Sequence, residues 1–314
     1  MRHFLNHPLL SIFAPAILGF LGALLSVNWV ALYGWSLFLG LPLAVSSLSS
    51  FLWCYGRKKS FLSAYGASIA SILILGGIIL VFAIDGLICL LMALPLALIL
   101  NLLGTAIGVS VAEACSPRGG GMYVLAICVS FPSLVGFEYA NHEEATVRRV
   151  TTSIEIKAPI EEVWVKVIQF PEIQEEPRGI FRLGIAYPIS AHIEGEGEGA
   201  VRYCTFSTGS FVEPITRWEE PELLAFDVVE NPPPMKEISF HEHVHANHLH
   251  GYMVSERGEF RLWEKDGQTI LQGTTWYHHD LAPEFYWGAI SDRIIQQIHL
   301  RVLTHIQKHA EATQ

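Results

Sequence analysis

The first 140 residues contain very little charge. They hold only five lysines or arginines and three aspartates or glutamates, whereas residues 141–314 hold the other fifteen basic and twenty-seven acidic residues. A soluble domain must present polar groups to water, so this composition excludes an ordinary soluble fold for the first part of the chain. The two parts carry formal charges of +2 and −12, which matches the net charge of −10 for the whole chain.

The second part lacks an excess of basic residues, since its acidic residues outnumber them twenty-seven to fifteen, and this acidic balance limits its partners. Binding to nucleic acid requires a basic surface that neutralises phosphates. A domain that lies flat on anionic lipid also needs clustered lysine or arginine. The sequence therefore argues against nucleic acid as a partner and against a domain spread on an anionic membrane surface.

Cysteine is equally scarce after residue 140. Cys204 is the only cysteine there, and the other four (Cys54, Cys89, Cys115 and Cys128) fall in the first part. A disulfide framework within the second part is therefore excluded, and no CxxC pair that would indicate a metal site occurs.

Long apolar runs fill the first part instead. A helix needs about twenty apolar residues to cross the ~30 Å hydrocarbon core of a bilayer. Five runs meet or approach this length: Leu9–Val27, Tyr33–Tyr55, Phe61–Ile84, Gly86–Ala112 and Met122–Tyr139. We therefore predict an N-terminal all-α transmembrane bundle of about five spans over residues 1–140, followed by a linker over residues 141–149.

The positions of positive charge between the spans predict their orientation. With five spans and a cytoplasmic N-terminus, Arg2, residues 57–59 and Arg118 all lie on the cytoplasmic side, as the positive-inside rule expects. This orientation predicts an integral protein of the plasma (inner) membrane whose soluble domain is extracytoplasmic. A count of four spans would reverse the side of the soluble domain, and this alternative stays open.

The fourth apolar run carries two features of helix packing. Gly104 and Gly108 form a GxxxG pattern that allows close approach of helices, so self-association through these glycines is possible. Asn101 is the only amide well inside a span, and we expect it to form a hydrogen bond to a neighbouring helix.

The pattern changes at Val150. Residues 150–157 alternate as a half-buried strand does, and residues 160–168 are typical of a short amphipathic helix. Further strands are predicted near residues 183–193, 200–207, 211–218 and 223–229, and a long final helix over about residues 283–309.

A β-hairpin around Asp266-Gly267 is the clearest local prediction. An Asp-Gly pair favours a two-residue type I′ turn, which fixes the pairing of the flanking strands. That register pairs Leu262 with Leu271 and Phe260 with Gly273. Continued to the far end of the hairpin, it pairs Glu256 with Tyr277.

These elements lead to a specific resemblance. Residues 150–311 resemble the START/Bet v 1-like superfamily, in its SRPBCC or polyketide cyclase/dehydrase-like branch. The resemblance is carried by the opening segment 153–159, by Glu162-Val163-Trp164, and by residues 273–277 before the final helix. It implies an α+β helix-grip fold, in which a curved antiparallel sheet surrounds a long C-terminal helix.

The family resemblance also implies a cavity for a hydrophobic ligand between the sheet and the final helix. Members include lipid carriers, hormone receptors, cyclases and chaperone activators, and no catalytic residues are common to all, so the fold does not fix a function. The residues expected to line the cavity are Phe226, Phe260, Tyr277, Tyr286, Ile294 and Ile298.

A cluster of histidines precedes the hairpin. On an extended strand His241, His243 and His245 would share one face, where imidazoles could bind zinc or copper. If the chain turns helical there, His245 and His248 could join instead. The same residues could instead respond to pH near neutrality or belong to a polar loop. Zinc is therefore a possible cofactor and not a required one.

Two classes of function remain open from the sequence. The first is a membrane-anchored module that binds, presents or transfers a hydrophobic small molecule or lipid. The second is a membrane-bound enzyme, either a cyclase/dehydratase-like acid–base catalyst or a metal-assisted one that uses residues 241–250.

Overall fold

The computed structural model describes residues 8–31, 33–115, 119–142, 145–238 and 251–312 of the chain. The chain divides into two compact units. The first is built mainly from residues up to 144, and the second mainly from residues 145 onward. Glu237 and the short segment Leu281–Pro283 group with the first unit.

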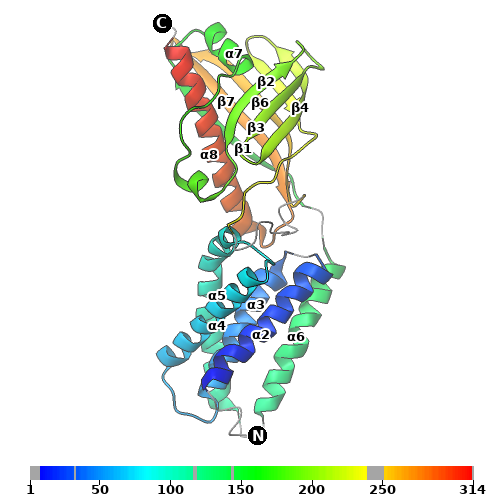
Figure 1. The fold of residues 1–314 in the computed structure, drawn as a ribbon, viewed down its shortest axis with the longest axis vertical. Coiled ribbons are helices and arrows are strands. Elements are labelled where there is room, and N and C mark those ends of the chain that lie inside the picture. The colour runs from blue at the N-terminus through cyan, green and yellow to red at the C-terminus, as the bar shows by residue number, and fades with distance from the viewer. Residues whose placement is uncertain (1–7, 32, 116–118, 143–144, 239–250, 313–314) are drawn as a thin grey trace. The chain divides into compact units, whose positions relative to one another are not determined.

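The first unit is helical (Figure 1). Over the described residues, five helices are long and apolar enough to cross a membrane, which confirms the predicted bundle of about five spans and indicates a membrane protein. Their bounds are α2 Pro8–Leu24, continued by the π-helical turn η1 Leu25–Trp29; the turn η2 Ser36–Gly40, continued by α3 Leu41–Cys54; α4 Phe61–Val81; α5 Leu87–Ala114; and α6 Gly120–Ala140.

The glycine pair of α5 packs within this unit. A side chain at Gly104 would collide with Ser46 of α3, and one at Gly108 would collide with the backbone of Ser47. Both glycines are therefore buried against α3 of the same chain. This corrects the prediction of self-association through Gly104 and Gly108, because the close approach that they allow is used between two helices of the same chain.

Asn101 also links helices inside the unit. Its Oδ1 accepts a hydrogen bond of 2.6 Å from Ser68 of α4, and the Ser68 hydroxyl lies 2.7 Å from that of Thr105. The predicted interhelical hydrogen bond of Asn101 is thus confirmed. Such bonds satisfy polar groups that would otherwise face hydrocarbon.

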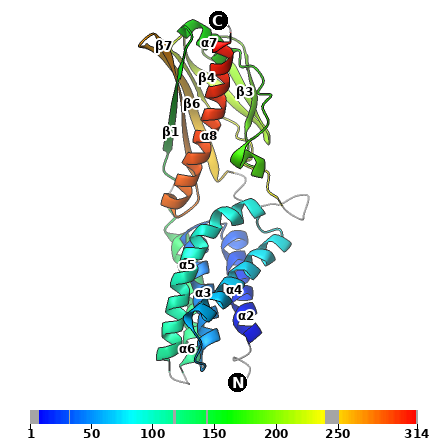
Figure 2. The same cartoon turned by 90° about the vertical axis from the view of Figure 1, so that its left-hand side faces the viewer.

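The second unit is an α+β fold. Its elements are β1 Arg148–Ile156, α7 Ile160–Ile168, the 3₁₀ turn η3 Gly179–Leu183, β2 Pro188–Glu194, β3 Val201–Phe206, β4 Gly209–Glu219, β5 Leu223–Asp227, β6 Met253–Lys265, β7 Gln268–His279 and α8 Glu284–Glu311. In the described part of this unit, seven antiparallel strands form one sheet in the order β1-β7-β6-β5-β4-β3-β2. The sheet curls around α8 (Figure 2), which confirms the predicted helix-grip fold.

The hairpin of β6 and β7 follows the predicted register except at its far end. Asp266 and Gly267 have φ angles of 52° and 76°, as a type I′ turn requires. Phe260 pairs with Gly273 as predicted, but the register shifts between Ser255 and Arg257. The predicted pairing of Glu256 with Tyr277 is therefore wrong, because a bulge at Glu256 makes Ser255 the partner of Tyr277.

The core of the second unit lies between the concave face of the sheet and helices α7 and α8. The buried side chains of α8 recur every three or four residues, as one face of a helix does. The buried ones include Trp287, Ser291, Ile295, Val302, Leu303 and Ile306. His299 falls on the same face, between Ile295 and Leu303, and this position brings an imidazole to the inside of the sheet.

Candidate functional site

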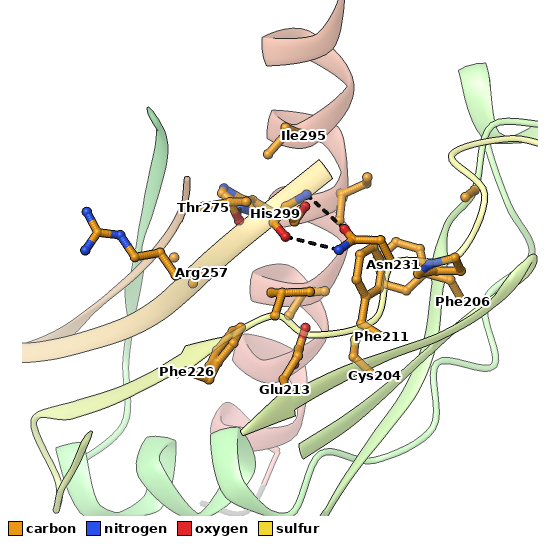
Figure 3. A pocket seen from close by; sticks show the side chains of 18 of the residues that line it. Cys204, Phe206, Phe211, Glu213, Phe226, Asn231, Arg257, Thr275, Ile295 and His299 are labelled. Carbon is orange, nitrogen blue, oxygen red and sulfur yellow. Dashed lines mark hydrogen bonds between the residues drawn. The ribbon is translucent and has the colours of Figure 1, made fainter. Parts of the chain in front are cut away.

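A cavity of about 150 Å³ lies between the sheet and α8 of the second unit. Figure 3 shows Phe206, Phe211 and Phe226 on the sheet side, and Ile295 and His299 on the helix side. Most of its wall is apolar, so the cavity favours a hydrophobic occupant.

The structure places four of the six predicted lining residues around this cavity. They are Phe226 and Phe260 from the sheet and Ile294 and Ile298 from α8. Sequence alternation and helical spacing located these side chains, since both patterns report which face of an element is buried.

Tyr277 and Tyr286 do not line the cavity, which corrects their predicted role. Tyr277 is fully buried beside Val150, and its hydroxyl donates a hydrogen bond of 2.6 Å to Oδ1 of Asp292. The hydrogen bond to Asp292 therefore holds the Tyr277 hydroxyl away from the cavity. Tyr286 lies in the first turn of α8, where its ring packs edge-on against Trp287 at 5.3 Å between ring centres.

A buried ion pair interrupts the apolar wall. Arg202 of β3 and Glu213 of β4 are paired in the strand register, and the side chain of Arg202 donates a hydrogen bond to the carboxylate of Glu213. The two residues are only 3% and 5% exposed. Burial raises the pKa of Glu213 and the guanidinium opposes that rise. The salt bridge joins one positive and one negative charge, so the pair carries no net charge.

Two aromatic rings hold the guanidinium of Arg202. Its central carbon lies 5.2 Å from the ring centre of Phe226 and 5.5 Å from that of Phe260. Rings at these distances attract a cation through their π electrons. The orientation of Arg202 is therefore set by Glu213 on one side and by the two rings on the other.

A second polar group in the wall is the imidazole of His299. Its Nε2 lies 2.8 Å from the Thr275 hydroxyl, and its Nδ1 lies 3.1 Å from the Thr152 hydroxyl. Burial lowers the pKa of His299 to about 4, so the ring is neutral near pH 7. These two hydrogen bonds fix the ring at the junction of α8, β1 and β7.

Residues 231–235, which we name the proline strap, form another part of the wall. Asn231 accepts a 2.8 Å hydrogen bond from the backbone of Ser255 and donates one of 3.2 Å in return (Figure 3). The carbonyl oxygen of Pro233 accepts a 2.7 Å bond from Thr208, and that of Pro234 accepts a 2.9 Å bond from Ala186. The strap is thus tied to β6, to the turn between β3 and β4, and to the segment before β2.

The predicted metal-binding residues His241, His243, His245 and His248 lie outside the described residues. Within the described residues, Asp85, Cys89 and Glu237 bring possible ligand atoms within 4.8 Å of one another. The carboxylate of Glu237 accepts hydrogen bonds from the backbone N–H groups of Ile88 and Cys89, so it caps the first turn of α5. Burial raises the pKa of Asp85 to about 7. Helix capping thus accounts for the position of Glu237.

Sequence reasoning missed Arg202, Glu213 and His299. A signal existed for two of them: Arg202 alternates with Cys204 and Phe206 on β3, and His299 follows Ile295 by one helical turn. The spacing alone predicts that both side chains face inward. Glu213 can be recognised as a site residue only when the pairing of β3 with β4 is known, because it contacts Arg202 of the neighbouring strand.

Comparison with known proteins gives fold neighbours only. No family model and no curated protein matches the chain. Solved structures with Bet v 1-like folds match its C-terminal half. Norcoclaurine synthase from Thalictrum flavum matches at 13% identity and a TM-score of 0.34, over 54% of this chain and 96% of that one. Ara h 8.0201 matches at 15% and 0.31, over 54% and 97%. Aha1 from Colwellia psychrerythraea matches at 14% and 0.28, over 49% and 93%.

Proposed function

We propose that the chain is a membrane-anchored binding module that takes up a small hydrophobic molecule in the cavity of its second unit. The observation that carries this proposal is the apolar cavity of about 150 Å³ between the sheet and α8. In proteins, an apolar cavity of roughly this volume holds one benzene ring. The enclosed part of the ligand is therefore about the size of a single ring.

The five apolar helices supply the anchor in this proposal. An extracytoplasmic position of the second unit, in the plasma (inner) membrane, is part of the same proposal and rests on the charge between the spans. A longer ligand such as a lipid extends beyond the enclosed volume, and displacement of the proline strap, which forms part of the wall, would enlarge that volume. Such displacement breaks the hydrogen bonds of Asn231 and Pro233.

The experiment that tests the binding function uses the full chain in lipid nanodiscs. Small molecules that co-purify are extracted and compared by mass spectrometry with those of empty nanodiscs and of a Gly273→Val variant. Gly273 faces Phe260, Leu303 and His299, so a larger side chain there fills the cavity. We expect a compound enriched in the wild type and depleted in the variant. Equal amounts in wild type, variant and empty nanodiscs would contradict the proposal.

A second candidate function is acid–base catalysis, and the observation in its favour is His299. A neutral imidazole hydrogen-bonded to the cavity-lining Thr275 can accept a proton through that hydroxyl. Incubation of the full chain with a cell metabolite extract tests this candidate. Compounds consumed by the wild type and not by a His299→Gln variant would support it, and identical profiles would count against it.

A further inference from the structure

The guanidinium of Arg202 carries a buried donor that is not used within the described part of the chain. Its Nε–H finds no hydrogen-bond partner there, although Arg202 is only 3% exposed and lines the cavity. A buried donor without an acceptor is energetically unfavourable, so native structures usually satisfy such groups. An acceptor atom on an occupant of the cavity would remove this cost.

The charge around Arg202 limits the kind of acceptor. Glu213 already neutralises the guanidinium, and both residues are removed from water. An anionic ligand would place a second negative charge beside one buried positive charge, and a buried charge without a partner is strongly unfavourable. His299 does not offset that charge, because burial keeps it neutral near pH 7.

The aromatic rings limit the shape of the ligand. The rings of Phe226 and Phe260, whose centres are 6.2 Å apart, lie beside the guanidinium and also line the cavity. A ligand that reaches Arg202 must therefore pass its apolar body along these rings.

We propose that the ligand of this cavity is an uncharged molecule with a ring-sized apolar body and an acceptor oxygen, such as a carbonyl, that accepts a hydrogen bond from Nε of Arg202. This inference rests on the proposed binding function and specifies its ligand class. Arg202 is then the residue that selects an oxygenated molecule over a hydrocarbon of the same shape.

The test uses pairs of probes with the same shape. Cyclohexanone and methylenecyclohexane differ only in a carbonyl oxygen against a CH₂ group, and benzamide and benzoate differ chiefly in charge. Each probe is titrated calorimetrically into the full chain in nanodiscs, with the heat of empty nanodiscs subtracted. The variant Arg202→Met/Glu213→Leu removes the donor while keeping the wall neutral and apolar, a kind of replacement that buried ion pairs usually tolerate.

We expect this double variant to weaken cyclohexanone binding at least about tenfold and to leave methylenecyclohexane binding within about twofold, since a hydrogen bond from a charged donor is worth roughly 1.5–3 kcal/mol. The matched control Arg217→Met/Glu219→Leu changes an exposed pair on β4 and should leave both affinities unchanged.

The remaining outcomes overturn different parts of the reasoning. Equal loss or no loss for both ring probes would overturn the role of Arg202 while the cavity still binds. Benzoate binding as tightly as benzamide would overturn the uncharged ligand class. Failure of every probe to bind the wild type above empty nanodiscs would overturn the binding function itself.

Discussion

Replacement of Gly273 by alanine should stabilise the second unit and weaken ligand binding at the same time. Gly273 lies in the interior of β7, between Thr152 of β1 and Phe260 of β6. An added methyl group would lie 3.7 Å from Leu303, 3.8 Å from Phe260 and 4.0 Å from His299. These are ordinary van der Waals distances, so the methyl group enters without displacing a neighbour.

The expected gain in stability has two sources. Burial of one methyl group contributes about 0.8 kcal/mol. The smaller conformational freedom of alanine in the unfolded chain adds about 0.4–1 kcal/mol. The variant should therefore be more stable by roughly 1–2 kcal/mol.

The expected loss in affinity follows from the same methyl group. Leu303, Phe260 and His299 all line the cavity, so the methyl group occupies ligand space. A misfit of about one methylene in an apolar pocket costs about 1–3 kcal/mol, which corresponds to a loss of about 10–200-fold in affinity. The sign of this effect is opposite to the sign of the stability change.

Two measurements on the full chain in nanodiscs check this prediction. Hydrogen exchange of the β7 amides reports the free energy of opening of the second unit, and titration with cyclohexanone reports affinity. Gly77→Ala is the matched control, because a methyl group there meets nothing within 4 Å and Gly77 lies in α4. Lower stability of Gly273→Ala would refute the packing argument. Unchanged affinity would refute the location of the binding site.

Three further predictions follow from the same structure. Gly258→Ala, in contrast to Gly273→Ala, should destabilise the second unit, because its methyl group would lie 2.7 Å from the ring of Phe226; equal β6 hydrogen exchange in both variants would contradict this. The stability of the second unit should fall as the pH drops from 6.5 toward 4, by up to about 3 kcal/mol, since the pKa of His299 is lowered to about 4 in the folded state and the unfolded chain then binds the additional proton. In His299→Gln this fall in stability should be smaller when hydrogen exchange is measured from pH 6.5 to 4. An equal fall in the variant would mean that another group causes it. A green fluorescent protein fused after Gln314 and exported by the general secretory route should stay dark if the C-terminus is extracytoplasmic, and a bright fusion would instead place it inside.

The elements of this protein were largely predictable because their signals are local. Apolar runs of membrane length identified the helices, and the Asp266-Gly267 pair identified the hairpin turn and most of its register. The register failed only at Glu256, because a bulge inserts a residue without any local sequence signal that we recognised. Local sequence patterns therefore predict helices and strands well but predict irregularities within them, such as the bulge, poorly.

The candidate site was harder to predict because it depends on contacts between distant residues. Tyr277 was expected in the cavity on the basis of its inward position, but Asp292 of α8 draws its hydroxyl elsewhere. Gly104 was expected to offer a face to another copy, but α3 of the same chain occupies that face. In both cases the sequence indicated the face of the strand or helix on which the residue lies. It did not indicate which group contacts that face, because such contacts depend on how whole elements pack.

The Arg202–Glu213 pair is difficult to explain by stability alone. Replacement of a buried ion pair by apolar residues of similar volume is often neutral or stabilising by about 1–4 kcal/mol, because the charges recover little more than their desolvation cost. A purely structural wall beside Phe226 and Phe260 would therefore be built as well from leucine or methionine. An ion pair can do what such a wall cannot, which is to present an oriented N–H donor in a place without water. If Arg202→Met/Glu213→Leu raises the stability of the second unit and weakens cyclohexanone binding, the ion pair has a role in ligand binding and not in stabilising the fold. If the stability of the second unit falls instead, the ion pair contributes to the fold itself.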